Sequence, residues 1–209
     1  MTWTLPNILT VLRLIAAPGV ALMFLYFSRP WADLFALLLF VLAAVTDWFD
    51  GYLARAWKQE SKFGAMLDPI ADKAMVVIAL VILTGYSGMN PWLILPVTVI
   101  LFREVFVSGL REFLGADAGR LKVTKLAKWK TTAQMVAIAI LFLGTGLDYM
   151  QTGRPPRAGE GELPDGLTLA DLATHLGVFL IWVAAVLTAI TGWDYFTKAL
   201  PFLRGPKNG

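Results

Sequence analysis

The chain has 209 residues, of which 57% are hydrophobic and only 16% are charged, and its mean hydropathy is +0.66. This composition excludes an ordinary water-soluble domain, which needs more polar surface, and predicts a polytopic membrane protein. The absence of cysteine excludes disulfides and thiolate metal sites, and the single His175 excludes a multi-histidine site. The net charge of +3 lies mostly in short loops between apolar runs, which favours membrane topology over nucleic-acid binding.

Six apolar stretches are long enough to cross a bilayer. In chain order they are residues 8–27, 31–54, 63–84, 91–114, 131–147 and 169–191. Spans this long and uniformly apolar do not fit a β-barrel, so we expect an all-α protein with six transmembrane helices in a single domain, 1–209. A short N-terminal interfacial segment, with Pro6 at the helix start, is expected before the first span.

Positive charge alternates between the two sides of the predicted bundle. Lysine and arginine gather at 55–62, 120–130 and 198–207, whereas the loop 148–171 holds five acids against two arginines. The positive-inside rule therefore places both termini in the cytoplasm.

Four aspartates lie at the predicted cytoplasmic ends of the second and third spans: Asp47, Asp50, Asp68 and Asp72. On a helix the first two share one face and the last two share another, and antiparallel neighbours would bring these faces together. Four carboxylates in a low-dielectric site need a neutralising cation, and hard oxygen ligands select Mg²⁺, Mn²⁺ or Ca²⁺. Since one Mg²⁺ rarely takes four protein carboxylates, two ions are plausible.

Two other interpretations of these aspartates remain open. Each residue alone could be an interfacial cap, paired for example with Arg55, although the joint spacing favours a site. A cation or proton transporter is the alternative from a different class, because intramembrane carboxylates mark ion paths. Their position at one membrane face, away from the midplane where transporters bind, favours an enzyme.

The four aspartates belong to a longer pattern, D-x₂-D-G-x₂-A-R-x₈-G-x₃-D-x₃-D, which runs from Asp47 to Asp72. At every position this pattern resembles the signature of the CDP-alcohol phosphotransferase family. The segments LPNILTVLRL, FREVFVSGLRE and KWKTTAQMVAIA extend the resemblance over nearly the whole chain. They look like the bacterial members that use glycerol 3-phosphate.

The resemblance implies that CDP-diacylglycerol donates its phosphatidyl group to glycerol 3-phosphate and that CMP leaves. It implies that the metal ions, Mg²⁺ or Mn²⁺, bind to Asp47, Asp50, Asp68 and Asp72, and that Asp72 is also the general base. Residues implied to frame CDP-diacylglycerol are Asp47, Gly51, Ala54, Arg55 and Gly64. Asn7, Thr10 and Arg13 recur every three residues on the first span and match the family's first-helix pattern. They are candidates for the nucleotide or diphosphate of the same substrate, or for a polar seam between helices.

A phosphorylated acceptor needs cations near these carboxylates. Arg103 and Arg111 are eight residues apart in the fourth span, so they lie on nearly the same helical face. Lys128 and Lys130 open the fifth span at the same interface. We expect Arg111 and Lys128 to bind phosphate, helped by matching positions in the resembled family, with Arg103 and Lys130 as further candidates and snorkelling as the alternative.

The depth of Arg103 in its span calls for a carboxylate partner, and Glu104 or a carboxylate of the aspartate cluster is available. A cationic acceptor site favours glycerol 3-phosphate or inositol phosphate over serine, and only the wider resemblance favours glycerol 3-phosphate. The resemblance also implies a homodimer among membrane lipids in a bacterial inner membrane, with its active site facing the cytoplasm. No nucleic-acid partner is expected.

Overall fold

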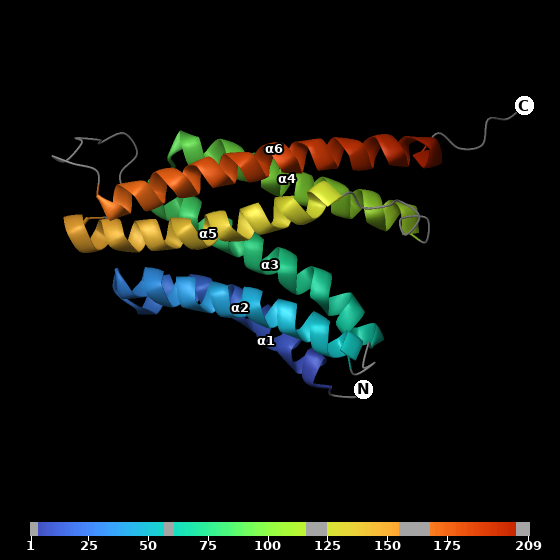
Figure 1. The fold of residues 1–209 in the computed structure, drawn as a ribbon, viewed down its shortest axis with the longest axis horizontal. Helices are drawn as coiled ribbons and strands as arrows, with labels where there is room; N and C mark the ends of the chain where they lie inside the picture. The colour runs from blue at the N-terminus through green and yellow to red at the C-terminus, as the bar shows by residue number, and fades with distance from the viewer. Residues whose placement is uncertain (1–3, 57–60, 116–124, 155–167, 204–209) are drawn as a thin grey trace, which may run out of the picture.

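The computed structural model of the chain describes residues 4–56, 61–115, 125–154 and 168–203, with their side chains except at 48, 50–56 and 125–128. Within these ranges the chain forms six α-helices (Figure 1). They are α1 (Leu5–Tyr26), α2 (Trp31–Ala56), α3 (Lys62–Tyr86), α4 (Pro91–Leu114), α5 (Lys125–Thr152) and α6 (Leu169–Leu203).

The helices form two groups that diverge at one end. α1 packs against α2 and α3, whereas α6 packs against α4 and α5. α3 crosses between the two groups, and its first turns lie farther from α5 than its last turns do (Figure 1). Because α2 ends and α3 begins where the groups diverge, the signature aspartates are carried to the open end of the molecule.

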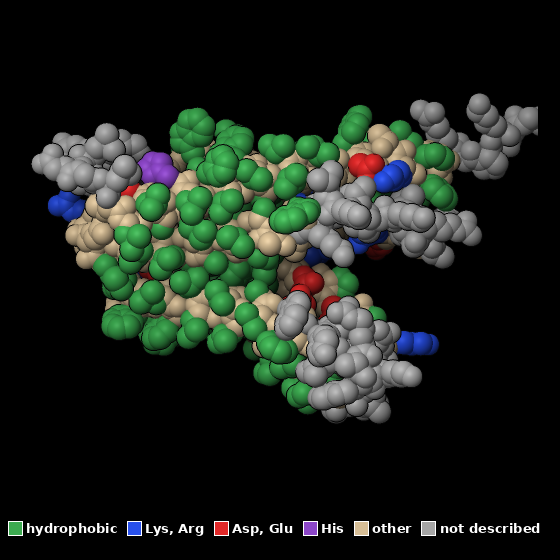
Figure 2. Space-filling model, viewed as in Figure 1, with side chains coloured by type: hydrophobic (Ala, Val, Ile, Leu, Met, Phe, Trp, Pro, Cys, Tyr) green, Lys and Arg blue, Asp and Glu red, His purple; other side chains and the backbone are tan. Residues whose placement is uncertain are grey.

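The surface is as apolar as a membrane protein requires. Four of the described helical segments are long and apolar enough to cross a membrane: Leu5–Tyr26, Pro91–Leu114, Trp129–Thr152 and Leu169–Leu203. Large hydrophobic side chains such as Phe102, Val105 and Phe113 are exposed, and Figure 2 shows hydrophobic side chains spread over much of the visible face. An isolated water-soluble protein rarely exposes so continuous an apolar surface, so the fold fits a polytopic membrane protein.

The helices confirm the all-α prediction, and their ends correct it in detail. α1 begins at Leu5, so within the described residues no interfacial segment stands apart from it; Pro6 fits the first turn, where its missing N–H costs nothing. α5 continues past the predicted end of its apolar run to Thr152 and stops where Gly153 adopts a φ of 63°. The hydropathy pattern predicts only where the apolar run ends, whereas the helix continues beyond that point through polar residues.

Close contacts between α5 and α6 depend on glycine. A Cβ added at Gly177 of α6 would lie 2.7 Å from Leu141 Cγ of α5, and one at Gly144 of α5 would lie 2.8 Å from Thr174 Oγ1 of α6. Small residues of this kind let membrane helices approach closely without a hydrophobic driving force between them.

A buried ion pair connects α2 to α5 at the end of the bundle away from the signature aspartates. Arg29 Nε and Nη2 donate to the two carboxylate oxygens of Asp33, each at 2.7 Å. Thr145 Oγ1 donates to Asp33 Oδ1 at 2.8 Å, and the guanidinium of Arg29 lies over the rings of Tyr86 and Tyr149. Asp33 is fully buried, and its charge is paired with that of Arg29 inside this end of the bundle.

Candidate active site

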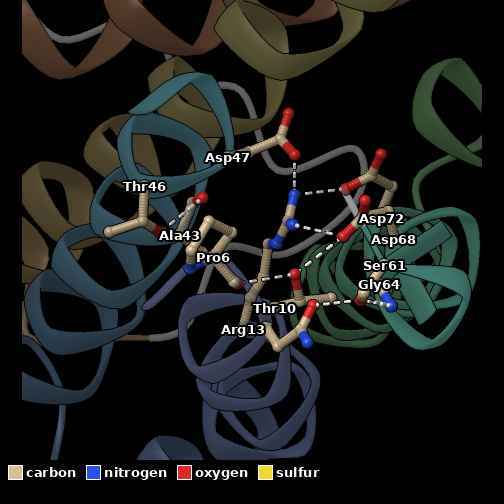
Figure 3. A network of polar contacts seen from close by, with 11 residues as sticks. Pro6, Thr10, Arg13, Ala43, Thr46, Asp47, Ser61, Gly64, Asp68 and Asp72 are labelled. Carbon is tan, nitrogen blue, oxygen red and sulfur yellow. Dashed lines mark hydrogen bonds and ion pairs between the residues drawn. The ribbon is translucent and has the colours of Figure 1, made fainter. Parts of the chain in front are cut away.

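Three of the predicted aspartates meet at a single guanidinium (Figure 3). Arg13 of α1 points between α2 and α3, where its Nη1 contacts Asp47 Oδ1 and lies 2.6 Å from Asp72 Oδ1. Its Nη2 lies 3.5 Å from Asp68 Oδ1. The side chain of Arg13 is 2% exposed, whereas those of the aspartates are 47%, 48% and 51% exposed. Arg13 therefore lies beneath carboxylates that are open on their other side.

The first turns of α1 hold α3 in place beside this ion pair. Thr10 Oγ1 donates to Asp68 Oδ1 at 2.7 Å. Ser61, the N-cap of α3, donates to Asn7 Oδ1 at 2.7 Å and accepts from the N–H of Gly64 at 3.0 Å. In this structure Asn7 and Thr10 thus form the polar seam between helices that the sequence offered as one of two roles.

Gly64 is also explained by this seam. A Cβ at Gly64 would lie 2.8 Å from Asn7 Oδ1, so a larger residue would force the Asn7 side chain to shift and would disturb the hydrogen bond that it accepts from Ser61. The family resemblance implied that Gly64 helps to frame CDP-diacylglycerol. In the structure the space next to Gly64 is taken by the Asn7 amide, and contact of either residue with substrate stays a prediction.

Five predicted site residues have side chains outside the described part of the structure: Asp50, Gly51, Ala54, Arg55 and Lys128. Their backbone lies within α2 or α5. Their predicted roles in metal, nucleotide and phosphate binding remain predictions.

A second charged cluster joins α3, α4 and α5. Glu104 Oε1 accepts from Lys130 Nζ at 2.5 Å and from Arg103 Nη1 at 3.2 Å. Lys73 Nζ donates to Ser108 Oγ, and Ser108 Oγ donates to the carbonyl oxygen of Glu104 at 2.5 Å. The predicted Arg103–Glu104 partnership is confirmed, and the structure brings Arg103 and Lys130 together.

Arg111 takes a separate place at the end of α4. Its guanidinium lies 5.3 Å from the ring centroid of Tyr195 in α6, and its side chain is otherwise exposed. Arg103 also faces α6, because a Cβ at Gly192 would lie 2.9 Å from Arg103 Cγ. The shared helical face is confirmed, although the two arginines have different partners.

The two charged clusters face each other across the open end of the molecule. Figure 2 shows acidic side chains at the inner edge of a hollow, and basic side chains with a few acidic ones on its α4–α6 side. Sequence reasoning gave Lys73 no role and left that of Arg13 open between substrate binding and a helix seam. The available signals were weak: Lys73 directly follows the last signature aspartate, and Arg13 interrupts an apolar run.

The donor set fits a hard divalent cation better than any other metal. Among the described side chains, no three acidic or histidine groups are placed together so as to hold an ion directly, because the carboxylates turn toward Arg13. The contacts that join Asp47, Asp68 and Asp72 to Arg13 all use Oδ1, and these side chains are half exposed. Carboxylate oxygens without cysteine or histidine are the ligands that Mg²⁺ and Mn²⁺ prefer.

An α-helical membrane bundle that places signature carboxylates near partly buried cations fits a membrane enzyme that acts on phosphorylated substrates. Residues 3–190 match the model of the CDP-alcohol phosphatidyltransferase family, and the chain belongs to this family. It is 72% identical, over 99% of its length and all of the relative, to a CDP-diacylglycerol–glycerol-3-phosphate 3-phosphatidyltransferase of Cereibacter sphaeroides. Enzymes of the same name from Salmonella choleraesuis (44% identical, 95% of this chain and 96% of the relative) and Rickettsia bellii (42%, 92% and 93%) are also similar. The family resemblance predicted from the signature is confirmed.

Proposed function

We infer that this chain transfers the phosphatidyl group of CDP-diacylglycerol to glycerol 3-phosphate, giving phosphatidylglycerophosphate and CMP. The observation that carries this conclusion is the 72% identity, over the full chain, to a relative of that named activity. The site geometry supports it, since three signature carboxylates converge opposite a cluster of cations.

The reaction needs one proton acceptor and one stabilised leaving group. Asp72 takes the proton from the acceptor hydroxyl while the hydroxyl oxygen attacks the β-phosphorus of CDP-diacylglycerol. The bond from that phosphorus to the bridging oxygen breaks, and CMP leaves with the electron pair. Arg13 contacts Asp72 Oδ1 at 2.6 Å and so orients the carboxylate for this step.

We propose that Asp47, Asp50, Asp68 and Asp72 hold two ions of Mg²⁺ or Mn²⁺. When bound, the ions would withdraw charge from the diphosphate and stabilise CMP as it leaves. Asn7, Thr10, Gly51, Ala54, Arg55 and Gly64 are proposed to frame the CDP group, with the small residues admitting the nucleotide close to the helices.

For the acceptor, we propose that Arg103, Arg111, Lys128 and Lys130 bind the phosphate of glycerol 3-phosphate. Support comes from the shared contact of Arg103 and Lys130 with Glu104, and from the position of Arg111 at the exposed end of α4. Arginine suits bidentate phosphate binding, and lysine adds a point charge.

The proposed setting is a bacterial inner membrane crossed by all six helices. The active site and both termini face the cytoplasm, where a water-soluble acceptor meets the head group of the lipid. A homodimer is proposed from the family resemblance.

One assay tests the activity. The purified chain is mixed with CDP-diacylglycerol, radiolabelled glycerol 3-phosphate and Mg²⁺, and CMP release is followed with and without EDTA. Metal-dependent release of CMP with labelled lipid is expected, and replacing the acceptor by inositol phosphate or serine should lower the rate strongly. No CMP release, with metal-dependent ion flux in liposomes instead, would favour the transporter alternative.

A further inference from the structure

Lys73 occupies the junction between the carboxylate cluster and the cationic cluster. It directly follows Asp72 in α3, and its ammonium crosses to α4, where it donates to Ser108 Oγ. Ser108 in turn donates to the carbonyl oxygen of Glu104, the residue whose carboxylate contacts Arg103 and Lys130. One chain of contacts thus runs from the residue beside the general base to the proposed phosphate site.

The charge of this cluster is unbalanced among the described side chains. Lys73, Arg103 and Lys130 carry three positive charges, and Glu104 carries one negative charge, which leaves an excess of two. The side chains of Arg103, Glu104 and Lys130 are 17%, 14% and 8% exposed. Excess charge held among apolar helices is costly unless an anion offsets it.

A phosphate monoester dianion carries the two negative charges that this cluster lacks. Phosphodiesters carry one negative charge and unphosphorylated alcohols carry none, so neither would balance the site. The acceptor must also present a hydroxyl to Asp72, and Lys73 is the cation tied by the backbone to that residue.

We propose that Lys73 binds the acceptor's phosphate and, with Arg103 and Lys130, sets the preference for a phosphate dianion. This inference rests on the proposed function. Lys73 is a binding residue here: it contacts the phosphate, while Asp72 beside it contacts the hydroxyl. Ser108 and Glu104 are positioning residues, because they hold the three cations in place before the acceptor arrives.

Substitution of Lys73 in the full-length purified chain tests this role. In Lys73→Met, the KM for glycerol 3-phosphate should rise about tenfold or more, as loss of a charge-assisted hydrogen bond implies. The KM for CDP-diacylglycerol should change less than about twofold, since the substitution removes a contact with glycerol 3-phosphate only. Inorganic phosphate should inhibit the wild type competitively against glycerol 3-phosphate, and its Ki should rise in Lys73→Met in parallel with that KM.

Two further variants separate charge from packing. Lys73→Arg keeps the charge, so its KM for glycerol 3-phosphate should stay much closer to the wild-type value than that of Lys73→Met. Lys198→Met removes a half-exposed lysine of α6 that pairs with Asp194, and should leave all constants unchanged.

The possible failures are distinguishable. An unchanged KM for glycerol 3-phosphate in Lys73→Met, or an equal defect in Lys73→Arg, would overturn the role of Lys73 while leaving the reaction in place. Absence of CMP release from the wild type would instead overturn the proposed function itself.

Discussion

Arg13 of α1 lies 2.6 Å from Asp72 of α3, and the same guanidinium contacts Asp47 of α2. The proposed general base is therefore held from beneath by a residue 59 positions earlier in the chain. This contact makes α1 part of the proposed active site, because it holds the carboxylates of two other helices around one buried positive charge.

Replacing Arg13 by glutamine should make the fold depend on metal. Without the guanidinium the three carboxylates repel one another, so the free energy of unfolding measured in EDTA should fall by about 2 kcal/mol. This loss is smaller than for a fully buried ion pair, because the aspartates are half exposed. Mn²⁺ would then be the remaining counter-ion, so the rise in Tm on adding Mn²⁺ should exceed that of the wild type. Thermal unfolding in detergent measures both effects.

The control for that experiment is Arg29→Gln, which breaks the ion pair with Asp33 at the other end of the bundle. It should lower Tm by the same amount with and without Mn²⁺. If Arg13→Gln responded to Mn²⁺ no more than the wild type does, Arg13 would not serve as the counter-ion of this cluster.

Asp72→Asn should reduce kcat by about a hundredfold to ten-thousandfold, the usual contribution of a general base. The amide keeps the size of the side chain and cannot accept the proton. Binding of CDP-diacylglycerol, followed by direct titration without acceptor, should largely survive. Asp194→Asn, which alters a half-exposed aspartate paired with Lys198, is the matched control and should retain wild-type kcat. Normal turnover in Asp72→Asn would remove Asp72 as the base.

The helices and the meeting of Asp47 with Asp68 and Asp72 followed from sequence because both depend on local rules. Apolar length gave the helices, and helical spacing placed Asp47 on one face and Asp68 with Asp72 on another. Because only five residues separate the end of α2 from the start of α3, few arrangements of these two helices are possible. The helix ends were predicted less well, since α5 and α6 continue through polar residues that a hydropathy pattern leaves out.

The partners of these residues did not follow from sequence, because they depend on how distant helices cross. The contact of Arg13 with three aspartates requires the tilt of α1 against α2 and α3. The reach of Lys73 to Ser108 requires the approach of α4 to α3. Periodicity assigns a residue to a helical face, but it does not say which side chain that face meets.

Arg111→Ala should raise the KM for glycerol 3-phosphate with little change in kcat, as loss of uniform binding does. An increase of about tenfold corresponds to one charge-assisted hydrogen bond to phosphate. Steady-state CMP release with each substrate varied in turn gives the constants. Tyr195→Phe keeps the ring beneath the guanidinium and should behave as the wild type. A defect confined to CDP-diacylglycerol would show that Arg111 belongs to the nucleotide site.

Asp33→Ala should destabilise the bundle by about 3–5 kcal/mol, because it leaves the buried guanidinium of Arg29 without its carboxylate. The site lies at the end of the helices away from the signature aspartates, so kcat and both KM values of the folded fraction should stay unchanged. Unfolding in denaturant and CMP release from the same preparation measure the two effects. The double variant Arg29→Met with Asp33→Leu should recover much of the lost stability, since removing both charges avoids an unpaired buried ion. No recovery would mean that the contacts of Thr145 and the two tyrosines, and not the ion pair, hold this end together.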